Sequence, residues 1–215
     1  MRRAHREPRA DTSEQSFGNR ADAERMFPMR AMQRVDSGSG FELQRSENAE
    51  MALTLWGDLG LGWLGRLANA LSRRGIGIES VDAIRRADGS WFGTLQLGVA
   101  HATIAPTELD YFSLCSEGPE DRGAARELRL DRFQIERTAA GALELHLNGP
   151  DEVGFLAAVL DRCEFLGLFP ERLKVTTDQG TINDVLWLRG VANNAPSAEA
   201  ERALRAQFMR LSGIS

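Results

Sequence analysis

Two loops of this chain combine an acidic residue with closely spaced glycines, a combination that suits a small-ligand site. Residues 57–64 read Gly-Asp-Leu-Gly-Leu-Gly-Trp-Leu, and residues 149–156 read Gly-Pro-Asp-Glu-Val-Gly-Phe-Leu. Glycine lets a ligand approach the backbone closely. A helical pattern follows each loop, and the free N–H groups at a helix N-terminus favour an anion such as a carboxylate. The two loops therefore indicate binding chemistry.

Residues for catalysis or metal binding are few. His146 lies within a strand pattern, Cys115 has no paired base in the sequence, and Cys163 falls on an apolar helix face. Thiol catalysis requires a base close in space. His5 and His101 have no companions at metal-ligand spacing. We therefore expect no enzyme, no metal ion and no cofactor.

The second loop begins 92 residues after the first (149 minus 57), and the likeness continues beyond the loops. Further matches are Leu67 with Val159, Gly75 with Gly167, and Glu79 with Glu171. A period of this length is that of a small domain, not of a solenoid repeat. We expect a disordered tail over residues 1–40, a first domain over 41–137 and a second over 138–215.

In the first copy, residues 51–56 alternate as a strand does, and residues 64–71 carry an apolar stripe at helical spacing. Asp88-Gly89 is a strong hairpin signal between two further strands. A second helix is expected from Pro106 to about Ser116, and a fourth strand from Leu128 to Ile135.

The second copy repeats this order with clearer patterns. Strands are expected over residues 143–147, 173–177 and 182–189, and helices over 155–166 and 196–211. The order β-α-β-β-α, with a last strand in the first copy, is typical of the βαββαβ ferredoxin-like fold. The fold class is therefore α+β, with two tandem antiparallel sheets that each carry helices on one face.

At this point the chain resembles the ACT domain family, whose members share this fold and a loop of the form G-x-D-x-x-G-[LF]-L. Residues 149–156 match that loop, and Gly167-Leu168, Thr177 and Asp184-Val185-Leu186-Trp187 match its usual continuation. The resemblance covers about residues 50–100 and 143–212. The first copy departs from it, because its acid stands one place early and Gly93 replaces the strand aspartate.

The resemblance implies a regulatory module that binds a small amino-acid-like ligand between paired domains. An acid such as Asp151 would receive the ligand's ammonium group. The implied ligand-binding residues are Asp151, Glu152, Val153, Gly154 and Phe155 in the second copy, and Asp58, Gly62 and Trp63 in the first.

Three alternatives remain open at this stage. In the first alternative, Asp151 has no role beyond capping the following helix, and Asn183 and Asp184 hold plain surface or edge positions. The chain is a ligand-free interaction scaffold or a regulatory subunit for a partner enzyme. Fold analogy alone leaves room for a small enzyme that uses His146.

Composition narrows the choice of partners. The 215 residues carry a formal net charge of −5, whereas nucleic-acid binders usually show a basic face. No apolar run is long enough to span a membrane. Two cysteines form no disulfide framework, so we expect a cytoplasmic protein. Trp56 and Trp187 are expected to flank an exposed apolar surface, and we predict that the two copies dock within one chain, which then forms a homodimer.

Overall fold

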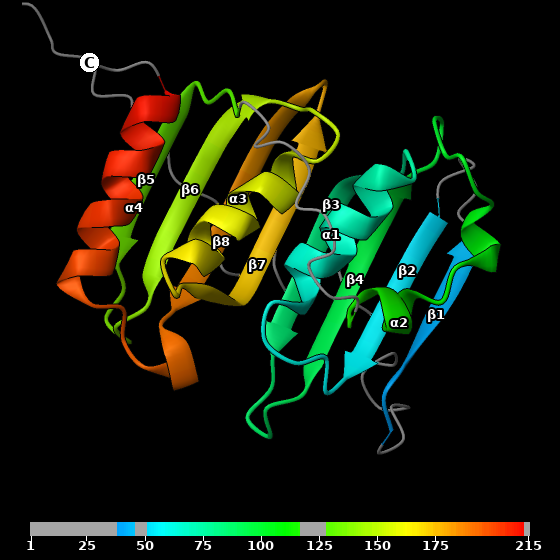
Figure 1. The fold of residues 1–215 in the computed structure, drawn as a ribbon, viewed down its shortest axis with the longest axis horizontal. Helices are drawn as coiled ribbons and strands as arrows, with labels where there is room; N and C mark the ends of the chain where they lie inside the picture. Colours follow the sequence, from blue (N-terminus) through cyan, green and yellow to red (C-terminus); the bar gives the residue numbers. More distant parts are fainter. Residues whose placement is uncertain (1–37, 46–50, 117–127, 213–215) are drawn as a thin grey trace, which may run out of the picture. The chain divides into compact units, whose positions relative to one another are not determined.

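Eight antiparallel strands form one continuous sheet, and the helices lie on one of its faces (Figure 1). The computed structural model describes residues 38–45, 51–116 and 128–212. The order across the sheet is β1-β2-β4-β3-β7-β8-β6-β5. The strands are β1 (Gly40–Arg45), β2 (Met51–Gly57), β3 (Gly77–Arg85), β4 (Trp91–Gly98), β5 (Arg132–Arg137), β6 (Leu143–Pro150), β7 (Phe169–Asp178) and β8 (Thr181–Arg189). This confirms the α+β class, and the two copies meet edge to edge in one sheet.

Four α-helices lie within the described residues: α1 (Trp63–Arg73), α2 (Tyr111–Leu114), α3 (Phe155–Phe165) and α4 (Ala198–Leu211). Short 3₁₀ turns occur at η2 (Pro106–Glu108) and η3 (Val191–Asn193). The helix expected from Pro106 to Ser116 is therefore a 3₁₀ turn followed by a single α-helical turn. Asp110 begins that turn, because its side chain accepts a hydrogen bond from the Ser113 N–H. None of the described helices is long and apolar enough to cross a membrane.

Along the chain, β2 to β5 follow the predicted β-α-β-β-α-β order, but the strand pairing groups the elements differently, so that each half has the order ββαββα. The strand expected to close the first copy is β5, which pairs with β6 of the second copy. The link between them is a tight turn in which Thr138 and Ala142 exchange hydrogen bonds. In the first half, β1 takes the corresponding place beside β2. In each half, the edge strand thus comes from the segment that directly precedes the repeated unit in the chain.

Residues 1–37, which make up most of the predicted tail, lie outside the described part of the chain. The predicted tail was expected to extend to residue 40, but Gly40 is the first residue of strand β1. The predicted domain limits, 41–137 and 138–215, stay a prediction. The described residues from 38 onward belong to one compact unit.

The core lies between the sheet and the helices. Alternate residues of β2 and β6 are buried, among them Leu53, Leu55, Leu145 and Leu147, as expected for a sheet with one covered face. The apolar stripe of α1 and the buried face of α3 close this layer from above.

A pseudo-two-fold axis relates the two halves. In the sheet, β3 pairs with β7, and Asp82 lies opposite Lys174, its own counterpart in the repeat. In the helix layer, the Asn69 side-chain amide donates to the Asp161 carboxylate at 3.2 Å, and these residues are again 92 apart. Equivalent positions therefore meet in both layers, as they do at an isologous dimer interface.

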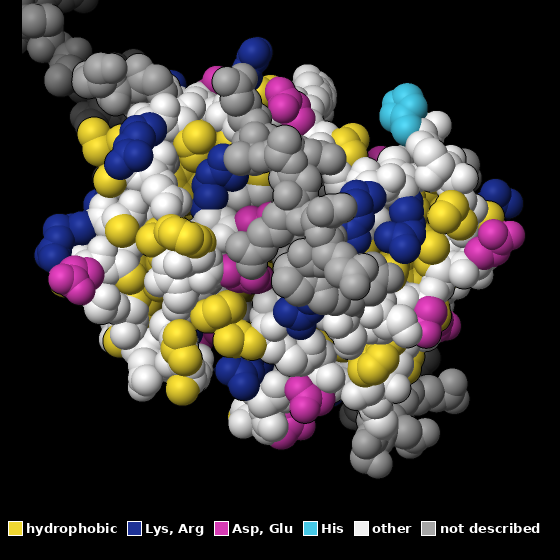
Figure 2. Space-filling model, viewed as in Figure 1, with side chains coloured by type: hydrophobic (Ala, Val, Ile, Leu, Met, Phe, Trp, Pro, Cys, Tyr) yellow, Lys and Arg dark blue, Asp and Glu magenta, His cyan; other side chains and the backbone are white. Residues whose placement is uncertain are grey.

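The face opposite the helices carries a row of side chains in cross-strand register. Trp56 lies opposite Phe92, Phe92 opposite Ile84, Ile84 opposite Arg172, and Arg172 opposite Trp187. The Arg172 guanidinium lies 4.9 Å from the centre of the Trp187 ring. On the helix-covered face, the parts drawn in colour intersperse acidic and basic side chains (Figure 2).

Candidate ligand site

Two cavities lie between the halves, and the repeat relates one to the other. The second-loop cavity, about 180 Å³, is lined by residues 151–157 of the second half and by residues 75–79 and His101 of the first. The first-loop cavity, about 100 Å³, is lined by residues 58 and 60–65 of the first half and by residues 169–171 of the second. A single water needs only about 10–15 Å³, so each cavity has room for more than isolated waters.

The structure divides the predicted site residues between these cavities. Asp151, Glu152, Val153, Gly154 and Phe155 all line the second-loop cavity. The three residues predicted in the first copy, namely Asp58, Gly62 and Trp63, all line the first-loop cavity. The loops therefore do not build one shared site, because the first loop faces the start of β7 and the second loop faces the start of β3.

The N-terminus of α3 opens into the second-loop cavity without a side-chain cap. Gly154 precedes the helix with φ of 91°, a left-handed conformation that favours glycine, and no side chain caps the helix. The Phe155 N–H donates to the Glu152 carbonyl. The alternative in which Asp151 only caps α3 is therefore wrong. Uncapped N–H groups of a first helical turn are a favourable place for an anion.

Asp184 is the residue that the sequence argument missed. It lies on β8 between Ile182 and Leu186, faces the core and is 1% exposed. Its Oδ1 accepts a long hydrogen bond of 3.4 Å from the Thr176 N–H, and its Oδ2 has no hydrogen-bond partner among the described residues. The expected surface or edge role for Asp184 is therefore wrong, because the strand register turns its side chain inward.

Burial raises the pKa of Asp184 to about 7. The hydrogen bond from the Thr176 N–H lowers this pKa, and the nearby Asp151 charge raises it by a smaller amount. Burial also raises the pKa of Asp151, while the Thr177 side chain opposes that rise. Both carboxyl groups line the second-loop cavity, as do Glu79 and Glu152. Of the described residues that line it, none is Lys or Arg.

The sheet opens where Asp184 lies. In the first half, Ala83 pairs with Gly93 and Ile84 with Phe92 without interruption. In the second half the equivalent pairs are missing from the β7–β8 ladder between Lys174↔Val185 and Thr177↔Ile182, although the register is the same on both sides. In that gap the Thr176 hydroxyl donates to the Asn183 carbonyl. Side-chain bonds thus replace ladder bonds beneath the cavity.

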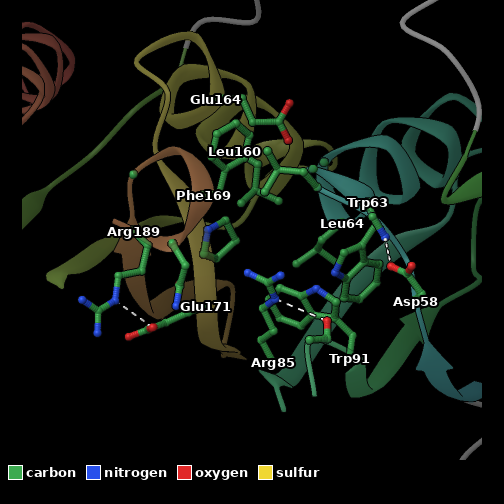
Figure 3. A pocket seen from close by; sticks show the side chains of 18 residues that line it. Asp58, Trp63, Leu64, Arg85, Trp91, Leu160, Glu164, Phe169, Glu171 and Arg189 are labelled. Atoms are coloured by element: carbon green, nitrogen blue, oxygen red, sulfur yellow. Dashed lines mark hydrogen bonds and ion pairs between the residues drawn. The ribbon is translucent and has the colours of Figure 1, made fainter. Parts of the chain in front are cut away.

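The first-loop cavity is built differently (Figure 3). Trp63 and Trp91 meet edge to face, with ring centroids 5.6 Å apart. The Asp58 carboxylate accepts a hydrogen bond from the Gly60 N–H of its own loop. On the opposite wall, Arg189 forms an ion pair of 2.8 Å with Glu171. These charges are satisfied within the protein.

Asp151 and Asp184 of the second-loop cavity have no acidic counterparts in the first. With the 92-residue offset, Asp151 corresponds to Leu59, which is 4% exposed. With the one-residue slip, Asp184 corresponds to Gly93 and Ile182 to Trp91. An apolar side chain, a glycine and a large ring thus stand where the second half has two carboxyl groups and an isoleucine.

The remaining reactive side chains lie apart from both cavities. His146 contacts Glu144 at 2.8 Å on a half-exposed part of β6. Cys115 and Cys163 are buried, and burial raises the pKa of each thiol to about 12. This disfavours the thiolate that nucleophilic attack requires. Within the described ranges, no three His, Cys, Asp or Glu side chains cluster closely enough to hold a metal ion.

Comparison with known proteins adds a distant likeness only. No protein-family model matches the chain, and no curated protein matches it. Among solved structures, the crystal structure of aspartate kinase from Synechocystis matches 75% of this chain, with a TM-score of 0.43 and 9% sequence identity. The chain spans 26% of that protein's length.

Proposed function

We propose that this chain is a non-enzymatic regulatory module that binds a small amino-acid-like ligand in the second-loop cavity. One observation carries the proposal: the cavity brings the uncapped N-terminus of α3 together with two carboxyl groups, those of Asp151 and Asp184. The helix end suits an α-carboxylate and the carboxyl groups suit an ammonium. These are the two charged groups of an amino acid.

The position of the cavity supports a regulatory role. Its walls come from both halves, which meet at the β3–β7 pairing. A ligand there would contact both halves and favour the arrangement that holds them together. The match of residues 149–156 to the ACT-type loop points the same way.

A thermal-shift screen of the full chain against the twenty amino acids tests the proposal, with calorimetry on any responder. A ligand present at a hundred times its Kd should stabilise the folded state by about 2.7 kcal/mol. Asp151→Asn is the matched control, because it keeps the side-chain shape but removes the charge, and its response should be much weaker. A folded protein that responds to none of the twenty would overturn the proposal.

A second candidate, an interaction scaffold, rests on the open face of the sheet. Trp56, Phe92 and Trp187 are half-buried there, and Ile84 is 42% exposed. Apolar patches of this kind often mark protein interfaces. Isolation of a stable protein partner whose binding is lost in Ile84→Asp, together with no response to amino acids, would favour this candidate over the first.

The homodimer predicted from the sequence is retained as part of the proposal, with the open face as the expected contact. Light scattering of the full chain at micromolar concentration tests it. A mass twice the 23.7 kDa of one chain is expected, and the mass of a single chain would contradict the dimer without touching the ligand site.

A further inference from the structure

We infer that the ligand of the second-loop cavity is an α-amino acid whose side chain carries a second positive charge, received by Asp184. This inference rests on the proposed function and narrows it to a class of ligand. It starts from Asp151 and Asp184, two carboxyl groups of a cavity that has no Lys or Arg among its described lining residues.

Asp184 is the group that needs a partner. It is 1% exposed, and one of its oxygens has no hydrogen-bond partner among the described residues. Buried polar atoms of native proteins are nearly always paired, and an unpaired one calls for an explanation such as a missing ligand. The cavity that Asp184 lines offers a place for that ligand.

The two acids occupy different parts of the cavity wall. Asp151 lies in the loop just before α3, next to the helix end that suits the α-carboxylate, so it is placed for the α-ammonium. Asp184 lies on β8, in the sheet below. A neutral amino acid would satisfy the loop and leave Asp184 unmatched.

The apolar part of the cavity wall suits an aliphatic stem. Ile78 of the first half and Val175, Ile182 and Phe155 of the second all line the cavity, and the last three are buried. Methylene groups pack favourably against such side chains, whereas a second charge requires the carboxylate beyond them. This arrangement matches lysine-like and ornithine-like molecules.

The first-loop cavity serves as an internal comparison. It has Leu59 and Gly93 at the corresponding positions, and its opposite wall holds an Arg189–Glu171 pair that is already matched. A cationic ligand therefore meets no buried carboxylate without a hydrogen-bond partner among the described residues there. Selection for a second positive charge belongs to the second-loop cavity alone.

The test is calorimetry of the full chain at pH 8 with three probes: lysine, norleucine and 1,5-diaminopentane. Norleucine lacks the side-chain ammonium, and 1,5-diaminopentane lacks the carboxylate. Lysine should bind about ten- to a hundredfold more tightly than either, because a hydrogen bond to a charged group is that strong. In Asp184→Asn, lysine should fall to the level of norleucine, while norleucine itself changes little.

The outcomes separate the two levels of the argument. Norleucine binding as tightly as lysine, or an Asp184→Asn variant that keeps the preference, would overturn the inference and leave the proposed function standing. 1,5-Diaminopentane binding as tightly as lysine would overturn the role of the helix end. No binding by lysine or by any neutral amino acid would overturn both. The comparison of lysine with norleucine needs only the wild-type chain, so it stands even where the variant fails to fold.

Discussion

The two cavities occupy equivalent places in a repeated fold but differ in what fills them. In the first, two tryptophan rings meet, and Arg189 forms an ion pair with Glu171. In the second, the equivalent space is larger, and a buried carboxyl group has an unpaired oxygen. The comparison teaches that only the second copy offers the unpaired buried carboxyl group on which the proposed site depends, whereas the first copy packs two aromatic rings at the equivalent place.

The strand beneath each cavity accounts for this difference. Ala83 and Gly93 pair in an unbroken ladder, and a Cβ added at Gly93 would lie 3.0 Å from the Ala83 Cβ. The same ladder opens in the second half, where Asp184 accepts the Thr176 N–H. A carboxyl group fits at this position only in the second half, where the β7–β8 ladder pairs are missing.

The largest expected effect follows from placing an acid in the first half. Gly93→Asp should destabilise the fold by more than about 4 kcal/mol, because it combines overpacking against Ala83 with an unpaired buried charge. Gly93→Ala is the matched control, with a loss of about 1 kcal/mol or slightly more. Urea unfolding at pH 8 measures both. Equal losses in the two variants would show that the charge has no part in the difference between the halves.

The ligand-free protein should become less stable as the pH rises from 4 to 7. Because Asp184 has a pKa of 3.8 when unfolded and about 7 when folded, its ionisation favours the unfolded chain, and the loss amounts to about 4 kcal/mol and is complete above pH 7. The other titratable side chains that line the same cavity are those of Asp151, Glu79, Glu152 and His101.

The comparison with Asp184→Asn isolates the one group from its neighbours. The difference in unfolding free energy between wild type and Asp184→Asn should grow in favour of the variant between pH 4 and pH 7. A constant difference across this range would mean that Asp184 stays ionised or stays exposed in the folded protein.

The glycines that begin the two helices should respond alike in stability and differently in binding. Gly62 and Gly154 have φ of 73° and 91°, so replacing either by alanine should cost about 1–2 kcal/mol. Only Gly154→Ala should weaken ligand binding, because only α3 opens into the acidic cavity. Thermal unfolding and calorimetry on both variants check this, and a loss of binding in Gly62→Ala would place the first loop in the site.

The smallest expected effect on stability concerns the hydrogen bond between Asn69 and Asp161, near the pseudo-two-fold axis that relates the halves. Asn69→Ala removes the partly buried bond to Asp161 and should cost about 1 kcal/mol. Asp161→Ala should have a similar effect, and the double variant should cost no more than the larger single change plus a few tenths. Additive losses would mean that the two side chains do not act as a pair.

Much of the fold was predictable because its signals are local. Alternation located β2 and β6, helical spacing located α1 and α3, and the glycines before both helices have the positive φ that their loops require. The repeat also indicated that the two copies dock within one chain. These features depend on residues close to one another in the chain, where sequence patterns are most informative.

The parts that could not be predicted depend on distant pairing. A strand was predicted from Leu128 to Ile135 and is found at Arg132–Arg137, but only its register with β6 shows which half it belongs to. Asn183 and Asp184 point to opposite faces of β8, and the side that is buried is set by neighbouring strands. For this reason Asp184 was predicted to lie at the surface and is found in the core.

Calorimetric titration of the full chain with lysine at pH 8 tests the central claim most directly, with Asp184→Asn and Arg85→Gln as the paired variants. Arg85 lines the first-loop cavity and donates to the Gly89 carbonyl. The account predicts one site per chain, much weakened in Asp184→Asn and unchanged in Arg85→Gln. Two equal sites per chain, or binding that survives in Asp184→Asn and is lost in Arg85→Gln, would contradict it.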